Sequence, residues 1–145
     1  MTVKELSQLY YLNREIEMDQ RRLEELEAKI GPQAQRLTGM PHGSNVVDSP
    51  EERLILEIVD LQAIIKAKQI QCIHERSRLE RYIESIDESR LRMTFTLRFI
   101  NGLSWHQVAA HLGDARLEDS IKKQVYRYLK ADKGDQEQLD RMDEE

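Results

Sequence analysis

The sequence predicts an all-α protein, in which a long antiparallel, coiled-coil-like helical hairpin is followed by a small helix-turn-helix module. Charged residues make up 34% of the 145 residues and aromatic residues only 6%, and the mean hydropathy is −0.68. This composition suits long solvated helices better than a thick globular core. Two runs of heptad-spaced apolar residues lie before residue 87, and a basic amphipathic segment lies near the C-terminus.

The first expected helix covers residues 2–30, where apolar residues recur every seven positions with further ones three positions on. These residues are Leu9, Leu12, Ile16, Leu23, Leu26 and Ile30. Asp19 is a polar break in the pattern, and Gly31-Pro32 ends it. Residues 31–48 collect Gly, Pro, Ser and Asn and are expected to form a loop.

The second expected helix begins with the capping box Ser49-Pro50-Glu51-Glu52 and extends to about residue 86. Its apolar stripe consists of Leu54, Ile58, Leu61, Ile65, Cys72, Leu79, Ile83 and Ile86. Lys68 and Glu75 interrupt the stripe. Because a helix with one apolar stripe must bury it, residues 1–86 are expected to form a hairpin that also serves as an oligomerisation element, with a homodimer favoured.

Charge is unevenly distributed along the chain. Residues 90–133 hold 9 basic and 4 acidic side chains, whereas residues 1–89 hold 12 basic and 17 acidic ones. Residues 134–145 hold 1 basic and 6 acidic side chains. The segment 132–145 is therefore expected to be an acidic, disordered tail. A basic segment inside an acidic chain is a local electrostatic footprint of the kind that nucleic acids attract.

The expected helix-turn-helix module covers residues 87–131. A helix over 88–100, with an S-x-x-E start at Ser85, is closed by Asn101-Gly102. Ser104 then caps a short helix whose apolar face contains Trp105, Val108, Ala109 and Leu112, and Gly113 begins a turn. A last helix over 118–130 buries Ile121, Val125, Tyr128 and Leu129 on one face.

The opposite face of this last helix is basic and predicts DNA contacts, although an ordinary solvated face is the alternative. Lys and Arg side chains on a helix that enters the major groove reach phosphates or guanine edges. The candidate DNA-binding residues are Ser120, Lys123, Arg127 and Lys130, with Lys122, Tyr126, Arg116 and Arg98 around them.

The stretch from Leu97 to Ala109, which contains Gly102-Leu103-Ser104-Trp105, resembles the start of region four of sigma factors. It is more similar still to phage proteins related to the RinA and ArpU late-gene transcription regulators, over nearly the whole chain. This resemblance implies promoter binding, control of phage or prophage late genes and a location in the cytoplasm of a bacterial host cell. Relative to a minimal helix-turn-helix, the turn between Gly113 and Glu118 is long, and Leu117 stands where a Ser, Thr or Asn cap is expected.

Two other functions remain open: a DNA-packaging subunit like the small terminases, and a sigma-like module that docks on RNA polymerase. Neither a catalytic set nor a cofactor motif is recognisable, so no enzyme activity and no cofactor are expected. His106 and His111 are five residues apart, which does not align them as metal ligands. No apolar run of the length that spans a membrane occurs.

Overall fold

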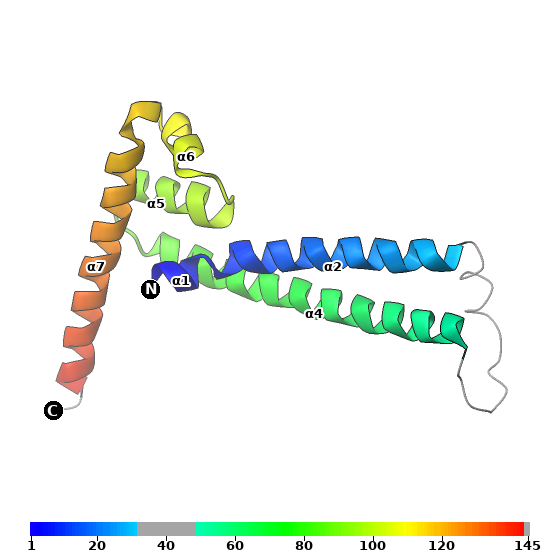
Figure 1. The fold of residues 1–145 in the computed structure, drawn as a ribbon. Helices are drawn as coiled ribbons and strands as arrows, with labels where there is room; N and C mark the ends of the chain where they lie inside the picture. The colour runs from blue at the N-terminus through cyan, green and yellow to red at the C-terminus, as the bar shows by residue number, and fades with distance from the viewer. Residues whose placement is uncertain (32–48, 144–145) are drawn as a thin grey trace. The chain divides into compact units, whose positions relative to one another are not determined.

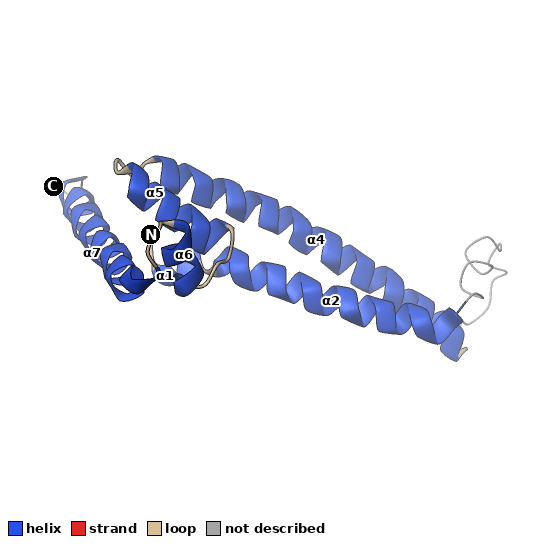
Figure 2. Ribbon diagram, turned by 90° about the horizontal axis from the view of Figure 1, so that it is seen from above, coloured by secondary structure: helices blue, strands red, loops and turns tan. Residues whose placement is uncertain are grey.

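The computed structural model describes residues 1–31 and 49–143, and all regular structure in these ranges is helical, as predicted (Figure 2). The helices are α1 (Val3–Leu6), α2 (Gln8–Ile30), α4 (Pro50–Glu84), α5 (Ser89–Phe95), α6 (Trp105–His111) and α7 (Glu118–Asp143) (Figure 1). A π-helical segment, Thr96–Ile100, continues α5, and a 3₁₀ segment, Ala115–Leu117, precedes α7. The loop expected over 31–48 lies, from residue 32 onward, outside the described residues. None of the described helices is both long and apolar enough to cross a membrane.

The described chain divides into two compact units, residues 12–72 and residues 1–11 together with 73–145. This division falls within α4 and not near residue 86, where the sequence places the boundary between its two expected modules. The last turns of α4 belong with the C-terminal helices, because Tyr82 contacts Phe95 and hydrogen-bonds to Asp132 of α7. The sequence reveals a helix that runs through both units but not the point at which its packing partners change.

The unit formed by residues 12–72 is the predicted antiparallel hairpin of α2 and α4, which lie side by side in both views (Figures 1 and 2). Three side-chain hydrogen bonds between the helices show that they are antiparallel, because residue numbers rise along α2 as those of their partners fall along α4. They join Asn13 to Cys72, Asp19 to Lys68, and Arg22 to Glu57. Leu12, Ile16 and Leu26 of α2 are buried, Leu23 and Ile30 are half-buried, and Ile65 of α4 is buried as well. The heptad pattern thus identified the packing faces correctly.

Two of the three polar interruptions of the heptad pattern, Asp19 and Lys68, face each other. Lys68 Nζ lies 2.6 Å from Asp19 Oδ2, and both side chains are about three-quarters buried. The hydrogen bond to Asp19 raises the pKa of Lys68, so the ammonium is favoured in the folded state. Because the pair satisfies both charges only when these two positions are opposite each other, it opposes a shift of one helix along the other.

A double-mutant cycle at Asp19 and Lys68 tests this pairing. Lys68→Leu leaves the Asp19 carboxylate without its partner and is expected to lower the free energy of unfolding by about 1–3 kcal/mol. The double variant Asp19→Leu, Lys68→Leu restores a continuous apolar seam, so it is expected to be as stable as the natural chain or more stable. Urea unfolding of all four proteins gives the coupling energy. Additive effects of the two single substitutions would show that the charges are not paired.

The second unit is organised around Phe95, which is fully buried at the end of α5. Its ring centroid lies 6.2 Å from that of Tyr82, 5.4 Å from that of Phe99 and 5.8 Å from that of Tyr128. Offset and edge-on aromatic contacts at these separations add to the burial of apolar area. One side chain therefore connects the end of α4, the α5 segment and α7.

The connection between α4 and α5 differs from the expected capping box. The Ser85 hydroxyl donates to the carbonyl of Tyr82, at the end of α4, and does not cap the following helix. Glu88 is the N-cap residue of α5 and makes no side-chain capping bond. The turn is instead closed by Arg92, whose Nη1 donates to the carbonyls of Ile86 and Asp87 at 2.6 and 3.1 Å. An S-x-x-E pattern cannot show that Arg92 replaces Ser85 in closing the turn, because Arg92 lies in the next helix, outside the pattern.

The expectation of a disordered tail after residue 131 is wrong for residues 132–143, which continue α7 as helix to Asp143. Seven of these twelve residues are Lys, Gln, Glu, Leu, Arg or Met, which favour helix, although four others are Asp, which does not. The single Gly134 costs about 1 kcal/mol relative to Ala but does not interrupt the helix. The high charge of this segment predicts disorder only if the helix propensity of its residues is left out.

Asp132 gives this helical extension an anchor in the rest of the unit. The Tyr82 hydroxyl donates to Asp132 Oδ2 at 2.9 Å. Burial of the Tyr82 ring, followed by this hydrogen bond to a carboxylate, raises the pKa of Tyr82 above its ordinary value of 10.0. The neutral phenol is therefore favoured in the folded state.

The raised pKa of Tyr82 predicts a loss of stability at alkaline pH. The unfolded phenol ionises from about pH 10 upward while the folded one stays neutral, so the tyrosine's contribution is complete below pH 10 and falls above it. Tyr82→Phe is expected to cost about 1 kcal/mol at pH 7 through loss of the hydrogen bond. Urea unfolding from pH 8 to 11 should show the natural chain approaching the variant in stability. A gap that stays constant over this range would contradict the assignment.

Candidate nucleic-acid interface

Helix α6 begins with a reciprocal capping box. The Ser104 hydroxyl accepts from the Gln107 amide at 3.2 Å, and the Gln107 side chain accepts from the Ser104 amide at 2.9 Å. The sequence predicted the Ser104 cap but not the reciprocal bond from Gln107. Val108 and Ala109 of α6 are fully buried in one cluster with Ile121 of α7, and Trp105 packs against this cluster while remaining half-buried. The small Ala109 thus allows α6 to approach α7 closely.

The turn after α6 explains why no Ser, Thr or Asn is needed at position 117. Gly113 has a φ of +102°, a backbone conformation that favours glycine. Asp114 caps the 3₁₀ segment, because its Oδ1 accepts from the Arg116 amide at 2.9 Å. Helix α7 begins at Glu118, close to the expected start. Leu117, the residue before it, is 40% exposed. The capping residue lies three positions before Leu117, because a 3₁₀ turn separates it from the helix.

Helix α7 has two distinct faces over its first four turns. Ile121, Val125 and Leu129 are buried, with exposures of 5% or less. The residues predicted on the opposite side are all exposed, and we call them the basic face: Ser120, Lys123, Arg127 and Lys130. Within residues 1–31 and 49–143, neither an ion pair nor a side-chain hydrogen bond engages the three cationic members of this face. Their charges are thus available to an external partner.

Three further predicted residues lie beside the basic face. Lys122 is exposed, and the Arg116 side chain is 95% exposed in the turn, with Nε 3.9 Å from Asp114 Oδ1. Tyr126 is 42% exposed, and its ring centroid lies 6.4 Å from that of Trp105. These positions extend the surface from α7 across the turn and toward the first residue of α6.

Arg98 occupies a different environment from the other predicted residues. It is half-buried, its Nη1 donates to the carbonyl of Leu103 at 2.8 Å, and its guanidinium carbon lies 4.8 Å from the centre of the Trp105 ring. A guanidinium over an indole face gains a cation–π attraction. Arg98 therefore links the π-helical segment to the N-terminal end of α6, and the structure does not place it on the basic face.

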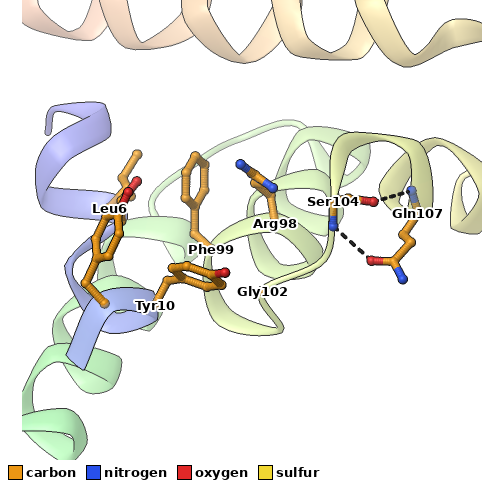
Figure 3. Close-up of a pocket in the computed structure, with 9 residues that line it drawn as sticks. Leu6, Tyr10, Arg98, Phe99, Gly102, Ser104 and Gln107 are labelled. Carbon is orange, nitrogen blue, oxygen red and sulfur yellow. Dashed lines mark hydrogen bonds between the residues drawn. The ribbon is translucent and has the colours of Figure 1, made fainter. Parts of the chain in front are cut away.

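A small pocket of about 310 Å³ lies beside Arg98 and was not predicted (Figure 3). Tyr10 lines it from α2, and its ring would contact a Cβ at Gly102, which has a φ of +70°. Phe99 lines it from the π-helical segment, and Ser104 and Gln107 line it from the start of α6. The sequence contains no indication of this pocket, because residues about 90 positions apart form it.

The arrangement combines a short capped helix, a tight turn and a second helix whose exposed face carries three cations, a combination that can attract a polyanion. In the described part of the chain, three or more His, Cys, Asp or Glu side chains do not gather into a cluster that could hold a metal ion. Comparisons of the chain with protein-family models, with curated proteins and with solved structures find no match.

The different environments of Arg98 and of the basic face predict different losses in the free energy of unfolding when an arginine is removed from each. Arg98→Ala removes a hydrogen bond and the contact with Trp105, so it is expected to lower the free energy of unfolding by about 1–2 kcal/mol. Arg127→Ala removes an exposed side chain without an internal partner and is expected to change it by less than about 0.5 kcal/mol. Thermal and urea unfolding of both variants provide the comparison. Equal losses would show that Arg98 has no structural role beyond that of an exposed arginine.

Proposed function

We propose that this protein binds double-stranded DNA through the basic face of α7 and regulates transcription from promoters of phage or prophage late genes. The observation that carries the proposal is the pairing of a buried face, formed by Ile121, Val125 and Leu129, with an exposed cationic face on the same helix. The buried face holds α7 against α6, so the cations are presented from a supported helix.

The charge distribution supports nucleic acid as the partner. The cations of the basic face have no internal partner among the described residues, and residues 90–133 carry five more basic than acidic side chains in a chain whose net charge is −5. Placing Lys or Arg near DNA phosphates releases condensed counterions, which provides the sequence-independent part of the affinity. Arg127, with its planar guanidinium, could in addition contact two acceptors on a guanine edge.

The promoter specificity and the phage context rest on the resemblance of the Gly102–Trp105 stretch to sigma region four and to late-gene regulators. In that role the helical hairpin would join two or more copies, so that each complex presents several modules to DNA. The proteins would act in the cytoplasm of the bacterial host, where RNA polymerase is a further candidate partner. These parts of the proposal are separable from DNA binding itself.

Substitution of the basic face tests DNA binding. A fluorescent random-sequence duplex, titrated with full-length protein at salt concentrations from about 50 to 200 mM, reports affinity and its salt dependence. Lys123→Ala combined with Arg127→Ala should reduce the salt slope by about 2, because each lost phosphate contact contributes about 0.9. On DNA selected from a phage genome by the natural chain, each residue that reads a base should cost about 1–3 kcal/mol.

A matched control is Arg21→Ala combined with Lys29→Ala, which removes the same number of exposed charges from α2. This variant should bind the duplex as the natural chain does. If the natural chain fails to bind duplex DNA at low salt, where non-specific attraction is strongest, DNA binding is excluded and docking on RNA polymerase becomes the preferred function. If both double variants lose the same affinity, the interaction reflects total charge and not the basic face.

A further inference from the structure

The pocket of about 310 Å³ beside Arg98 combines apolar and aromatic side chains with one cation (Figure 3). Leu6 and Phe99 line it and are buried, whereas Tyr10 and Tyr11 line it and are exposed. The pocket therefore has both a buried apolar part and aromatic residues that reach solvent. All residues that line it belong to one compact unit, formed by residues 1–11 and 73–145.

Arg98 carries a charge that no carboxylate balances. Among the described residues that line the pocket, it is the one charged side chain, and it is half-buried. Within residues 1–31 and 49–143, Arg98 makes no ion pair, and its one hydrogen bond is to the uncharged carbonyl of Leu103. A partly buried charge is costly unless an opposite charge accompanies it, as Asp19 accompanies Lys68 in the hairpin. An anion in the pocket would supply this missing partner.

The free edge of the Arg98 guanidinium has the geometry that a carboxylate requires. Nη1 donates to Leu103, and one face of the group lies against the Trp105 ring, 4.8 Å from its centre. Nε and Nη2 make no hydrogen bond in the described part of the chain. These two N–H groups point the same way and match the two oxygens of a carboxylate. Because Leu103 and Trp105 already fix the guanidinium, little ordering is needed when a ligand arrives.

We propose that this pocket binds a small aromatic carboxylate, with its carboxylate on the Nε–Nη2 edge of Arg98 and its ring among Leu6, Tyr10 and Phe99. Aromatic side chains favour offset or edge-on contact with a planar ring. A volume of about 310 Å³ is at the lower end for small-molecule sites, which fits a ligand of about one or two rings. One cation balances one carboxylate, whereas a phosphate dianion would bring an excess of negative charge.

The pocket is separate from the surface proposed to bind DNA. Not one member of the basic face of α7 lines it. The proposal therefore does not depend on DNA binding, and a failure of the duplex titrations would leave it intact. Its own failure would leave the basic face unaffected. The basic face is, however, a competing place for an anion, so the test must locate the bound carboxylate.

Titration of the full-length, ¹⁵N-labelled protein with benzoate, followed by amide NMR, tests and locates the site. We expect saturable shifts at residues 6–11 and 98–107, with half-saturation on the order of 1 mM. Benzamide, which has a similar shape without the charge, should bind at least about tenfold more weakly. Cyclohexanecarboxylate, which keeps the charge without a flat ring, should bind at least about threefold more weakly.

Several outcomes would overturn the proposal. Benzoate shifts that do not saturate, or that concentrate on the basic face of α7, would show that the pocket is not the site. Equal binding of benzamide would exclude a charge-based contact with Arg98, and equal binding of cyclohexanecarboxylate would exclude selection for a ring. Tighter binding of phenyl phosphate than of benzoate would contradict the carboxylate. All of these comparisons use the natural chain and so do not depend on the stability of a variant.

Arg98→Lys tests the guanidinium while keeping the positive charge. Lysine is a point charge without a two-donor edge, so the affinity for benzoate should fall at least about fivefold, with amide positions away from the pocket unchanged. The matched control is Arg90→Lys, the same replacement at an exposed arginine of α5 that does not line the pocket. This control should bind benzoate as the natural chain does. Equal affinities of the two variants would show that Arg98 does not hold the carboxylate.

Discussion

The burial of Phe95 is the constraint on which the C-terminal unit depends. Its ring contacts Tyr82 at the end of α4, Phe99 in the π-helical segment and Tyr128 on α7, so a single side chain orders three segments. Helix α7 can expose a cationic face because its other face is held in this way. A helix as polar as α7 would have little stability in isolation, because helices in water depend mainly on packing an apolar face. The surface proposed to bind DNA is therefore a consequence of the core behind it.

In the hairpin, apolar packing between α2 and α4 is combined with one buried charged pair. Its seam is largely apolar, and the charged pair of Asp19 and Lys68 within it favours one register at some cost in desolvation.

Sequence reasoning succeeded wherever local periodicity carries the information. It identified α4 and both faces of α7, and it expected one helix over residues 2–30, where the structure has α1 and α2 separated at Ser7. It was wrong at Ser85, where a capping pattern was present but Arg92 closes the turn, and beyond residue 131, where charge suggested disorder and the chain remains helical. Both errors arose from weighing one local property without its competitor.

The sequence by itself determined the all-α architecture, the ends of most helices and the concentration of basic residues in 90–133, because each depends on residues a few positions apart. Only the tertiary structure decided which side chains those elements bring together. Three features join positions separated by 49 residues or more. They are the pair of Asp19 and Lys68, the hydrogen bond between Tyr82 and Asp132 that anchors α7, and the pocket lined by Tyr10. Arg98 shows the same limit at short range. Its charge suggested a DNA contact, and only the folded backbone places it over Trp105, because the π-helical segment and the turn at Gly102 set that approach.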